Sequence, residues 1–116
     1  MALRKTQNLL SSLEVERMVS NAHQASDLLK ALSQESRLLI LCLLSQGEKS
    51  VGELEEFLSL KQSTVSQQLA RLRLEGLVTS RRDGQTIYYS LASEDVATIL
   101  DALYEIFCDR KAKRRR

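Results

Sequence analysis

The segment LKQSTVSQQLARLRLEGLVTSRRDGQTIYYSL, residues 60–91, changes its hydrophobic period once, at Gly76. Before this glycine, apolar side chains recur at helical spacing, which predicts one buried helix face. Those residues are Val65, Leu69 and Leu72. After it, apolar and polar residues alternate on both sides of Asp83-Gly84, a dipeptide that favours a type I′ hairpin turn. We therefore expect a helix that runs to Gly76 and then two strands, at about 77–82 and 85–91.

Three serines nearer the N-terminus are expected to cap the helices that follow them, because a serine hydroxyl accepts a bond from a free N–H at a helix start. Ser33 precedes ESRLLILCLLSQ, an apolar helix that should end at Gly47. Ser50 opens SVGE, which has the S-x-x-E capping-box pattern, before a short helix at about 51–58. Ser59 opens SLKQ, which repeats this pattern before the helix that runs to Gly76.

The sequence also predicts a helix near each end of the chain. The first carries an apolar stripe formed by Met18, Ala22, Ala25, Leu29 and Leu32. Such a seam in so small a protein favours dimerisation. The last helix is capped by Ser93 and has acidic residues in its first turn, where they complement the helix dipole. Its stripe is formed by Val96, Ile99, Leu100, Leu103, Ile106 and Phe107.

The expected order is helix, helix, short helix, helix, hairpin, helix. Two helices joined by a tight turn and followed by a β-hairpin form a winged helix-turn-helix, a mainly α fold with a small β-hairpin wing. We expect a partly helical extension at 1–15, the winged helix-turn-helix domain with its dimerisation helices at 16–109, and a disordered basic tail at 110–116.

Charge is spread unevenly along the chain. The net charge is +2, from 17 basic and 15 acidic residues, but six of the basic residues lie in the tail RKAKRRR. Residues 1–109 therefore carry 11 basic and 15 acidic residues, a net −4. Within them, residues 61–82 hold five basic residues and one acidic residue, a local +4. Positive charge thus gathers where the motif and the wing would meet phosphates.

Other features of the sequence exclude several classes of protein. The N-terminus has no apolar run long enough for a signal peptide or a membrane span, and two cysteines alone do not suggest a secreted disulfide framework. We expect a cytoplasmic protein without membrane contact. There is no Gly-rich phosphate loop and no C-x-x-C, and the lone histidine, His23, has no nucleophile nearby in sequence. We expect neither an enzyme nor a bound cofactor.

The outward face of the helix after Ser59 is rich in hydrogen-bonding side chains. Gln suits adenine, Ser and Thr suit several bases, and Arg suits guanine, so this face fits double-stranded operator DNA. The candidate DNA-binding residues of the helix are Gln62, Ser63, Thr64, Ser66, Gln67, Gln68 and Arg71. Arg81 and Arg82, before the wing turn, are expected to contact the DNA backbone or minor groove. The alternative is a winged-helix interaction module without operator binding.

The segments LLKALSQESRLLILCLL, LKQSTVSQQLARLRLEGLV and RRDGQTIYYSL follow one another in an order that resembles the ArsR/SmtB family of repressors. The resemblance covers roughly residues 20–108. It implies a homodimeric winged-helix protein whose first and last helices form the interface, and which blocks transcription until an inducer lowers its affinity for DNA.

Many members of this family sense metals, and the ligands of their sites are missing here. Where one site has Cys-x-Cys, this chain has Ser50 and Gly52. Where a second site uses His and acidic residues along the last helix, this chain has Asp95, Asp101 and Glu105 but no histidine. Two thiols without a neighbouring imidazole make a poor zinc site, so no metal ligands are assigned. A metal-responsive or arsenite-responsive repressor remains the alternative within the family.

The chain has two cysteines. Cys42 lies in the aliphatic run LLILCLL, and Cys108 lies just before Asp109 and the basic tail. Taken alone, Cys42 is a core residue, because a free cysteine behaves as a small hydrophobe. The pair resembles that of the persulfide-responsive repressors of the family, the biofilm-regulator and sulfide-quinone-reductase-regulator type. The resemblance implies that reactive sulfur species bridge the two redox-sensing cysteines by a disulfide or polysulfide, which releases operator DNA and derepresses sulfide-detoxification genes.

Overall fold

The computed structural model describes residues 11–109, and these fall into two compact units that divide between Glu35 and Ser36. The expectations for residues 1–10 and for the basic tail at 110–116 lie outside the described residues. Among the helices that are described, none combines the length and the apolar character needed to span a membrane.

The first unit contains helix α2 (Ser12–Leu32), which confirms the predicted N-terminal helix. It begins where the Ser11 hydroxyl accepts a bond of 3.2 Å from the Glu14 N–H. Met18 and Leu29, from the predicted apolar stripe, are 51% and 57% exposed. Ser33 ends this helix instead of capping the next one, because its hydroxyl donates to the Lys30 carbonyl at 2.9 Å. The predicted cap at Ser33 is therefore wrong.

The second unit begins with three helices, α3 (Glu35–Ser45), α4 (Val51–Leu58) and α5 (Gln62–Leu74). The capping box at the start of α4 is confirmed: the Ser50 hydroxyl accepts from the Glu53 N–H, and the Glu53 carboxylate accepts from the Ser50 N–H. Ser59 does not cap α5. It ends α4 in a left-handed conformation, with φ of 54°, because the chain must reverse there between two helices.

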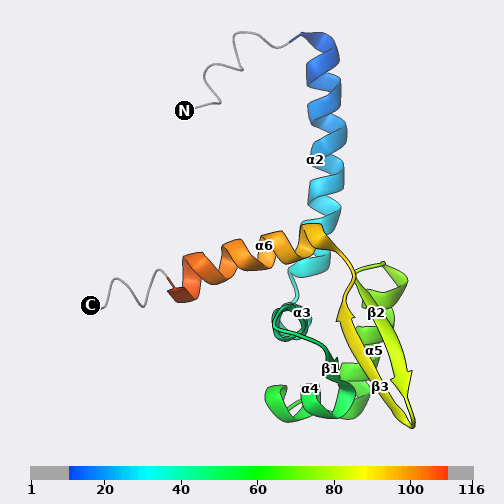
Figure 1. The fold of residues 1–116 in the computed structure, drawn as a ribbon. Coiled ribbons are helices and arrows are strands. Elements are labelled where there is room, and N and C mark those ends of the chain that lie inside the picture. Colours follow the sequence, from blue (N-terminus) through cyan, green and yellow to red (C-terminus); the bar gives the residue numbers. More distant parts are fainter. Residues whose placement is uncertain (1–10, 110–116) are drawn as a thin grey trace. The chain divides into compact units, whose positions relative to one another are not determined.

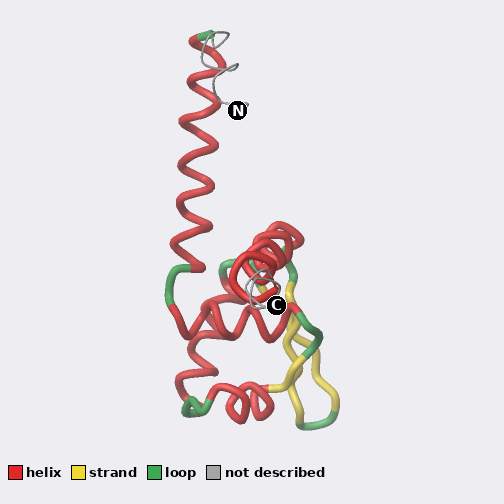
Figure 2. The backbone as a smooth tube through the Cα atoms, turned by 90° about the vertical axis from the view of Figure 1, so that its left-hand side faces the viewer, coloured by secondary structure: helices red, strands yellow, loops and turns green. Residues whose placement is uncertain are grey.

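The wing is a three-stranded antiparallel sheet with the order β1-β3-β2, formed by β1 (Lys49–Ser50), β2 (Val78–Asp83) and β3 (Thr86–Leu91). Figure 2 shows its hairpin in yellow beside the helices of this unit. Asp83 pairs with Thr86, so the turn residues are Gly84 and Gln85. Only Gly84 has a positive φ, of 63°, which fits a type II′ turn. The predicted type I′ turn at Asp83-Gly84 is wrong by one residue.

The last helix, α6 (Glu94–Tyr104), is capped by the Ser93 hydroxyl as predicted and continues as a π-helix, η1 (Glu105–Asp109). Figure 1 shows α6 passing over α3. Only the first half of its apolar stripe is buried. Ile106 and Phe107, in η1, are 45% and 60% exposed.

The core of the second unit is aliphatic and draws on all four α-helices as well as the start of the wing. Its buried members are Ile40, Leu41, Leu44, Leu54, Val65, Leu69, Leu72, Leu77, Val78, Val96 and Leu100. Each fully buried side chain of this size contributes about 1.5–3 kcal/mol by leaving water. The predicted buried face of α5 is confirmed, since Val65, Leu69 and Leu72 are all 0% exposed. That burial fixes which side of α5 points outward.

Candidate functional site

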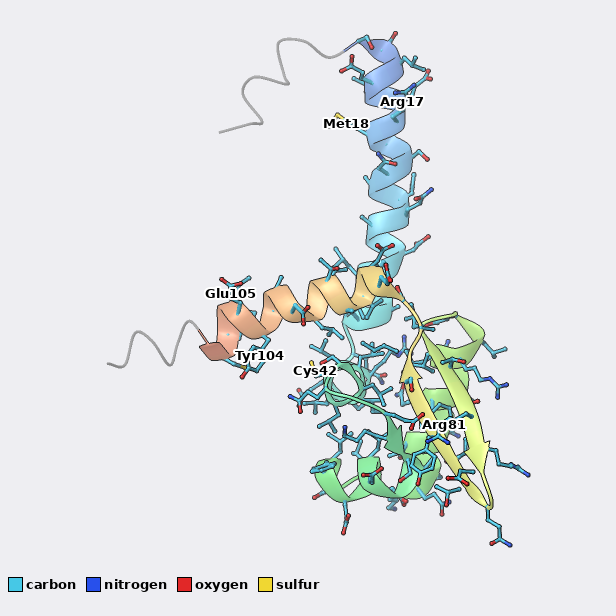
Figure 3. The ribbon with its side chains drawn as sticks, in the orientation of Figure 1. Arg17, Met18, Cys42, Arg81, Tyr104 and Glu105 are labelled. Carbon is cyan, nitrogen blue, oxygen red and sulfur yellow. The ribbon has the colours of Figure 1, made fainter. Side chains whose placement is uncertain are left out.

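Two cysteines from different elements line one pocket of the second unit. Cys42 comes from α3 and Cys108 from η1, and the pocket has a volume of about 630 Å³. Figure 3 shows the Cys42 sulfur on the side of α3 that faces α6. The rest of the lining is mostly apolar: Leu38, Leu39, Leu100, Leu103, Tyr104 and Phe107, with Ser45, Gln46 and Asp101 as the polar members. The fold thus brings the two thiols of the chain to the same cavity.

The two thiols have different surroundings. Cys42 is half-buried, whereas its neighbours Ile40 and Leu41 are completely buried, so it lies at the edge of the core and not within it. Burial raises the pKa of the Cys42 thiol above 9.0, and the nearby Cys108 raises it further. Cys108 is exposed, and both cysteines are free. Burial therefore favours the protonated form of the Cys42 thiol, while Cys108 is open to solvent.

Helix α5 presents most of the predicted recognition side chains outward. Its buried face packs in the core, so the opposite face is left for a ligand. The outward residues are Gln62, Ser63, Ser66, Gln67 and Arg71, which are exposed, and Thr64, which is half-buried. Hydrogen-bonding groups on one exposed helix face are the arrangement that base recognition in a major groove requires.

Gln68 differs from these neighbours because its amide bonds to α3. The Arg37 Nε donates to Gln68 Oε1 at 3.2 Å, and Gln68 Nε2 donates to the Ser36 hydroxyl at 3.4 Å. Arg37 also lies 3.9 Å from the Glu75 carboxylate, and its side chain is only 11% exposed. The prediction that Gln68 points outward is therefore wrong: its place on α5 directs it to α3.

The wing arginines also differ from one another. Arg81 forms an ion pair with Glu48 through two hydrogen bonds of 2.7 Å, and its guanidinium lies 4.7 Å from the Tyr88 ring centroid. The bond to Arg81 holds the pKa of Glu48 below its usual 4.5, and the same bond raises the pKa of Arg81. Arg82 is exposed, and among the described residues no carboxylate pairs with it.

The positions compared with metal sites have other surroundings. Ser50 is used in the capping box of α4, Asp101 lines the thiol pocket, and His23 is exposed on α2. Within residues 11–109, no group of three or more His, Cys, Asp or Glu side chains is arranged to hold a metal ion.

Sequence reasoning missed three partners that the structure brings in: Glu48, Ser36 and Arg37. Glu48 lies 33 positions from Arg81, and no local pattern links them. Arg37 could have been found from the sequence, because this charged residue directly precedes the apolar run LLILCLL, and a charged residue that is buried there needs a partner.

Comparison with known proteins places this geometry in a family. The model of the "Bacterial regulatory protein, arsR family" matches residues 34–80. The transcriptional activator HlyU of Vibrio cholerae is 44% identical over 96 residues, which cover 83% of this chain and 89% of that protein. The biofilm growth-associated repressor of Agrobacterium fabrum is 43% identical over 99 residues, 85% of each chain.

A solved structure, reduced HlyU from Vibrio cholerae, superposes with a TM-score of 0.76 at 45% identity, covering 80% of this chain and 98% of that one. The fold, the order of its elements and the sequence similarity over most of each relative all point to the same family. The protein is a winged helix-turn-helix, DNA-binding transcriptional regulator of the ArsR family.

Proposed function

We propose that this regulator is a homodimeric repressor that binds double-stranded operator DNA while Cys42 and Cys108 are reduced. Reactive sulfur species then release it by bridging the two thiols, which derepresses sulfide-detoxification genes. The observation that supports the proposal most directly is that both cysteines line one pocket of about 630 Å³. One relative is described in a reduced form, so redox state is a defined variable for that protein.

The bridging chemistry needs only a hydropersulfide, RSSH, as sulfur donor and oxidant. The exposed Cys108 attacks the outer sulfur of RSSH, which gives Cys108–SSH and RSH. Cys42 then attacks the sulfur bonded to the Cys108 side chain, which forms Cys42–S–S–Cys108 and releases H₂S. If both thiols first take up sulfur, the same displacement gives a trisulfide and one H₂S. In both cases, the two electrons lost by the thiols leave on the released sulfide.

The bridge would act on DNA binding through α3. A bond between Cys42 and Cys108 ties η1 to α3, and α3 is hydrogen-bonded to α5 through Arg37 and Gln68. A change in the position of α3 is therefore passed to the helix that carries the DNA-reading side chains. A coupling of about 1–3 kcal/mol would weaken operator binding roughly 5- to 150-fold.

The proposed DNA surface combines α5 and the wing. The outward side chains of α5 would read base edges in the major groove, and exposed Arg82 would contact phosphate. The base-reading set is Gln62, Ser63, Thr64, Ser66, Gln67 and Arg71. A dimer would place two such helices on half-sites about one helical turn apart.

Two exposed apolar surfaces support the dimer. Met18 and Leu29 of α2 are more than half exposed, and so is Phe107 of η1. Exposed apolar residues of this size on one stripe mark an interaction surface. A second copy of the chain is the partner that we propose for them, through the first and last helices.

Operator release by thiol bridging can be tested on DNA selected in vitro by the reduced protein. Fluorescence anisotropy should show that hydropersulfide releases this DNA from wild type and not from Cys42→Ser or Cys108→Ser. Ser45→Ala, which alters the same pocket without removing a thiol, should respond like wild type. A single-cysteine variant that is released as readily as wild type would exclude the two-thiol switch.

Two further measurements separate the alternatives. Intact mass spectrometry distinguishes a disulfide, which loses two hydrogens, from a polysulfide, which gains sulfur. A panel that includes arsenite and zinc tests metal response, and release by arsenite without any change in covalent mass would favour an arsenite sensor. A promoter–reporter fusion then shows whether bound protein represses or activates, since the relatives are named for both directions.

A further inference from the structure

The guanidinium of Arg81 is held from two sides within the wing. Its Nε and Nη2 each donate a bond of 2.7 Å to a different oxygen of Glu48, which lies just before β1. Two parallel bonds between a guanidinium fork and a carboxylate are the strongest form of this ion pair. The pair therefore ties β2 to the segment that begins the sheet.

Tyr88 supports Arg81 from a third strand. It pairs with Arg81 across the β2–β3 hairpin and with Ser50 across β1 and β3. Its ring lies 4.7 Å from the guanidinium, within cation–π range. Figure 3 shows Arg81 directed toward the β1 side of the sheet. The contacts of Arg81 thus join β2 to β3 and to the residue just before β1.

Arg82 is the natural comparison because it is the next residue on the same strand. Successive residues on a strand point to opposite faces, so Arg82 points away from Glu48 and Tyr88. It is exposed, and no ion pair is formed by its guanidinium within the described part of the chain. Moving Arg81 to a phosphate would exchange one charge-assisted pair for another, whereas Arg82 would break no ion pair with a described residue.

We propose that Arg81 is a positioning residue that clamps the wing to the β1 segment through Glu48 and Tyr88, and that Arg82 is the wing cation that contacts phosphate. This inference rests on the DNA surface proposed above and not on the thiol switch, so all measurements use the reduced protein. The proposal also lowers the positive charge that we expect on the wing surface facing DNA. Glu48 compensates the charge of Arg81, so among the described residues of β2 one arginine, and not the two that the sequence predicted, is left to contact phosphate.

The clamp can be tested first without DNA, by amide hydrogen exchange of β2 and β3 in the full-length protein. Arg81→Lys keeps the charge but loses the guanidinium fork, and Glu48→Gln removes the carboxylate charge. Each should speed exchange of the wing amides, by up to about fivefold, because the wing opens more often. The double variant should exchange no faster than either single variant. Arg82→Lys, the matched control, should leave exchange unchanged. Equal exchange in wild type and both clamp variants would overturn the clamp.

The second measurement is the dependence of operator affinity on salt. Each phosphate contact adds about 1 to the slope of log K against log salt concentration. Arg82→Ala should lower the slope by about 1, whereas Arg81→Ala should leave it unchanged. If Arg81 instead contacts phosphate, Arg81→Ala lowers the slope by about 1, and that result would overturn the assignment. A smaller salt slope in Arg82→Ala, together with an unchanged slope in Arg81→Ala, would support the assignment of Arg82 as the phosphate contact.

Discussion

The Arg37 Nε on α3 donates a hydrogen bond of 3.2 Å to Gln68 Oε1 on α5. This bond joins the helix that carries Cys42 to the helix that presents the proposed DNA-reading side chains. Because the Arg37 side chain is only 11% exposed, its charge depends on protein partners and not on water. The bond is therefore both a source of stability and a direct link between α5 and the helix that carries Cys42.

Gln68→Ala should lower the free energy of unfolding by about 1–3 kcal/mol, because it removes an acceptor from a nearly buried guanidinium. Urea denaturation measures this, and an unchanged m-value would show that the denatured state is unaffected. The matched control is Gln67→Ala, one residue away but exposed, which should stay within about 0.5 kcal/mol of wild type. Equal losses in the two variants would contradict the structural role of Gln68.

Much of the fold was predictable because its signals are local. The capping box at Ser50 and Glu53 lies within four residues, and it set the start of α4 correctly. The spacing of Val65, Leu69 and Leu72 set the buried face of α5 for the same reason, since helical periodicity acts over a few turns. These elements needed no knowledge of tertiary contacts.

The errors arose where two elements compete for one residue. Ser33 and Ser59 each stand between helices, and each ends the helix before it: the Ser33 hydroxyl donates to the Lys30 carbonyl, and Ser59 adopts a left-handed conformation. The hairpin turn lies one residue later than predicted, because the pairing of Asp83 with Thr86 makes Gly84 the first turn residue. A sequence pattern offers both choices at such positions, and packing of the neighbouring elements decides between them.

The part of the candidate site that the sequence did not predict depends on contacts between residues far apart in the chain. Gln68 fits the pattern of an outward residue as well as Gln67 does, and only the position of α3 separates them. Glu48 and Arg81 are likewise linked through a sheet whose first strand has two residues, too few for any periodic signal. The thiol pocket itself forms only because α6 passes over α3.

Leu69→Ala should lower the free energy of unfolding by about 2–5 kcal/mol, because Leu69 is completely buried and its loss leaves a cavity. Leu74→Ala, on the same helix but with Leu74 90% exposed, should change it by less than about 0.5 kcal/mol. Thermal or urea unfolding of the two variants tests the assigned face of α5. Similar destabilisation by both would mean that the helix is rotated from the position described.

The wing ion pair should be insensitive to pH near neutrality. Since the bond to Arg81 lowers the pKa of Glu48 in the folded state, the pair contributes to stability above the usual pKa of 4.5. That contribution is lost as the pH falls through the lowered folded-state pKa. An NMR titration of the Glu48 carboxyl carbon should show a midpoint below 4.5 in wild type and a higher one in Arg81→Ala. Arg82→Ala should leave the Glu48 midpoint unchanged. If Arg81→Ala also leaves the midpoint unchanged, the ion pair is not formed in solution.

Cys108 should react with iodoacetamide before Cys42 at pH 7. Cys108 is exposed, whereas burial raises the pKa of Cys42 above 9.0 and leaves little thiolate to react. Below that pKa, the labelling rate of Cys42 should rise about tenfold per pH unit, because the thiolate fraction rises by that factor. Peptide mapping after brief labelling gives both rates.

The single-cysteine variants separate the two causes of the raised pKa. In Cys108→Ser the smaller cause, the neighbouring thiol, is gone, so Cys42 should label somewhat faster than in wild type. It should still label more slowly than Cys108 in Cys42→Ser, because burial remains. This order of reaction is the reason that we propose Cys108 as the entry point for sulfur and Cys42 as the thiol that closes the bridge. Faster labelling of Cys42 at neutral pH would reverse that order.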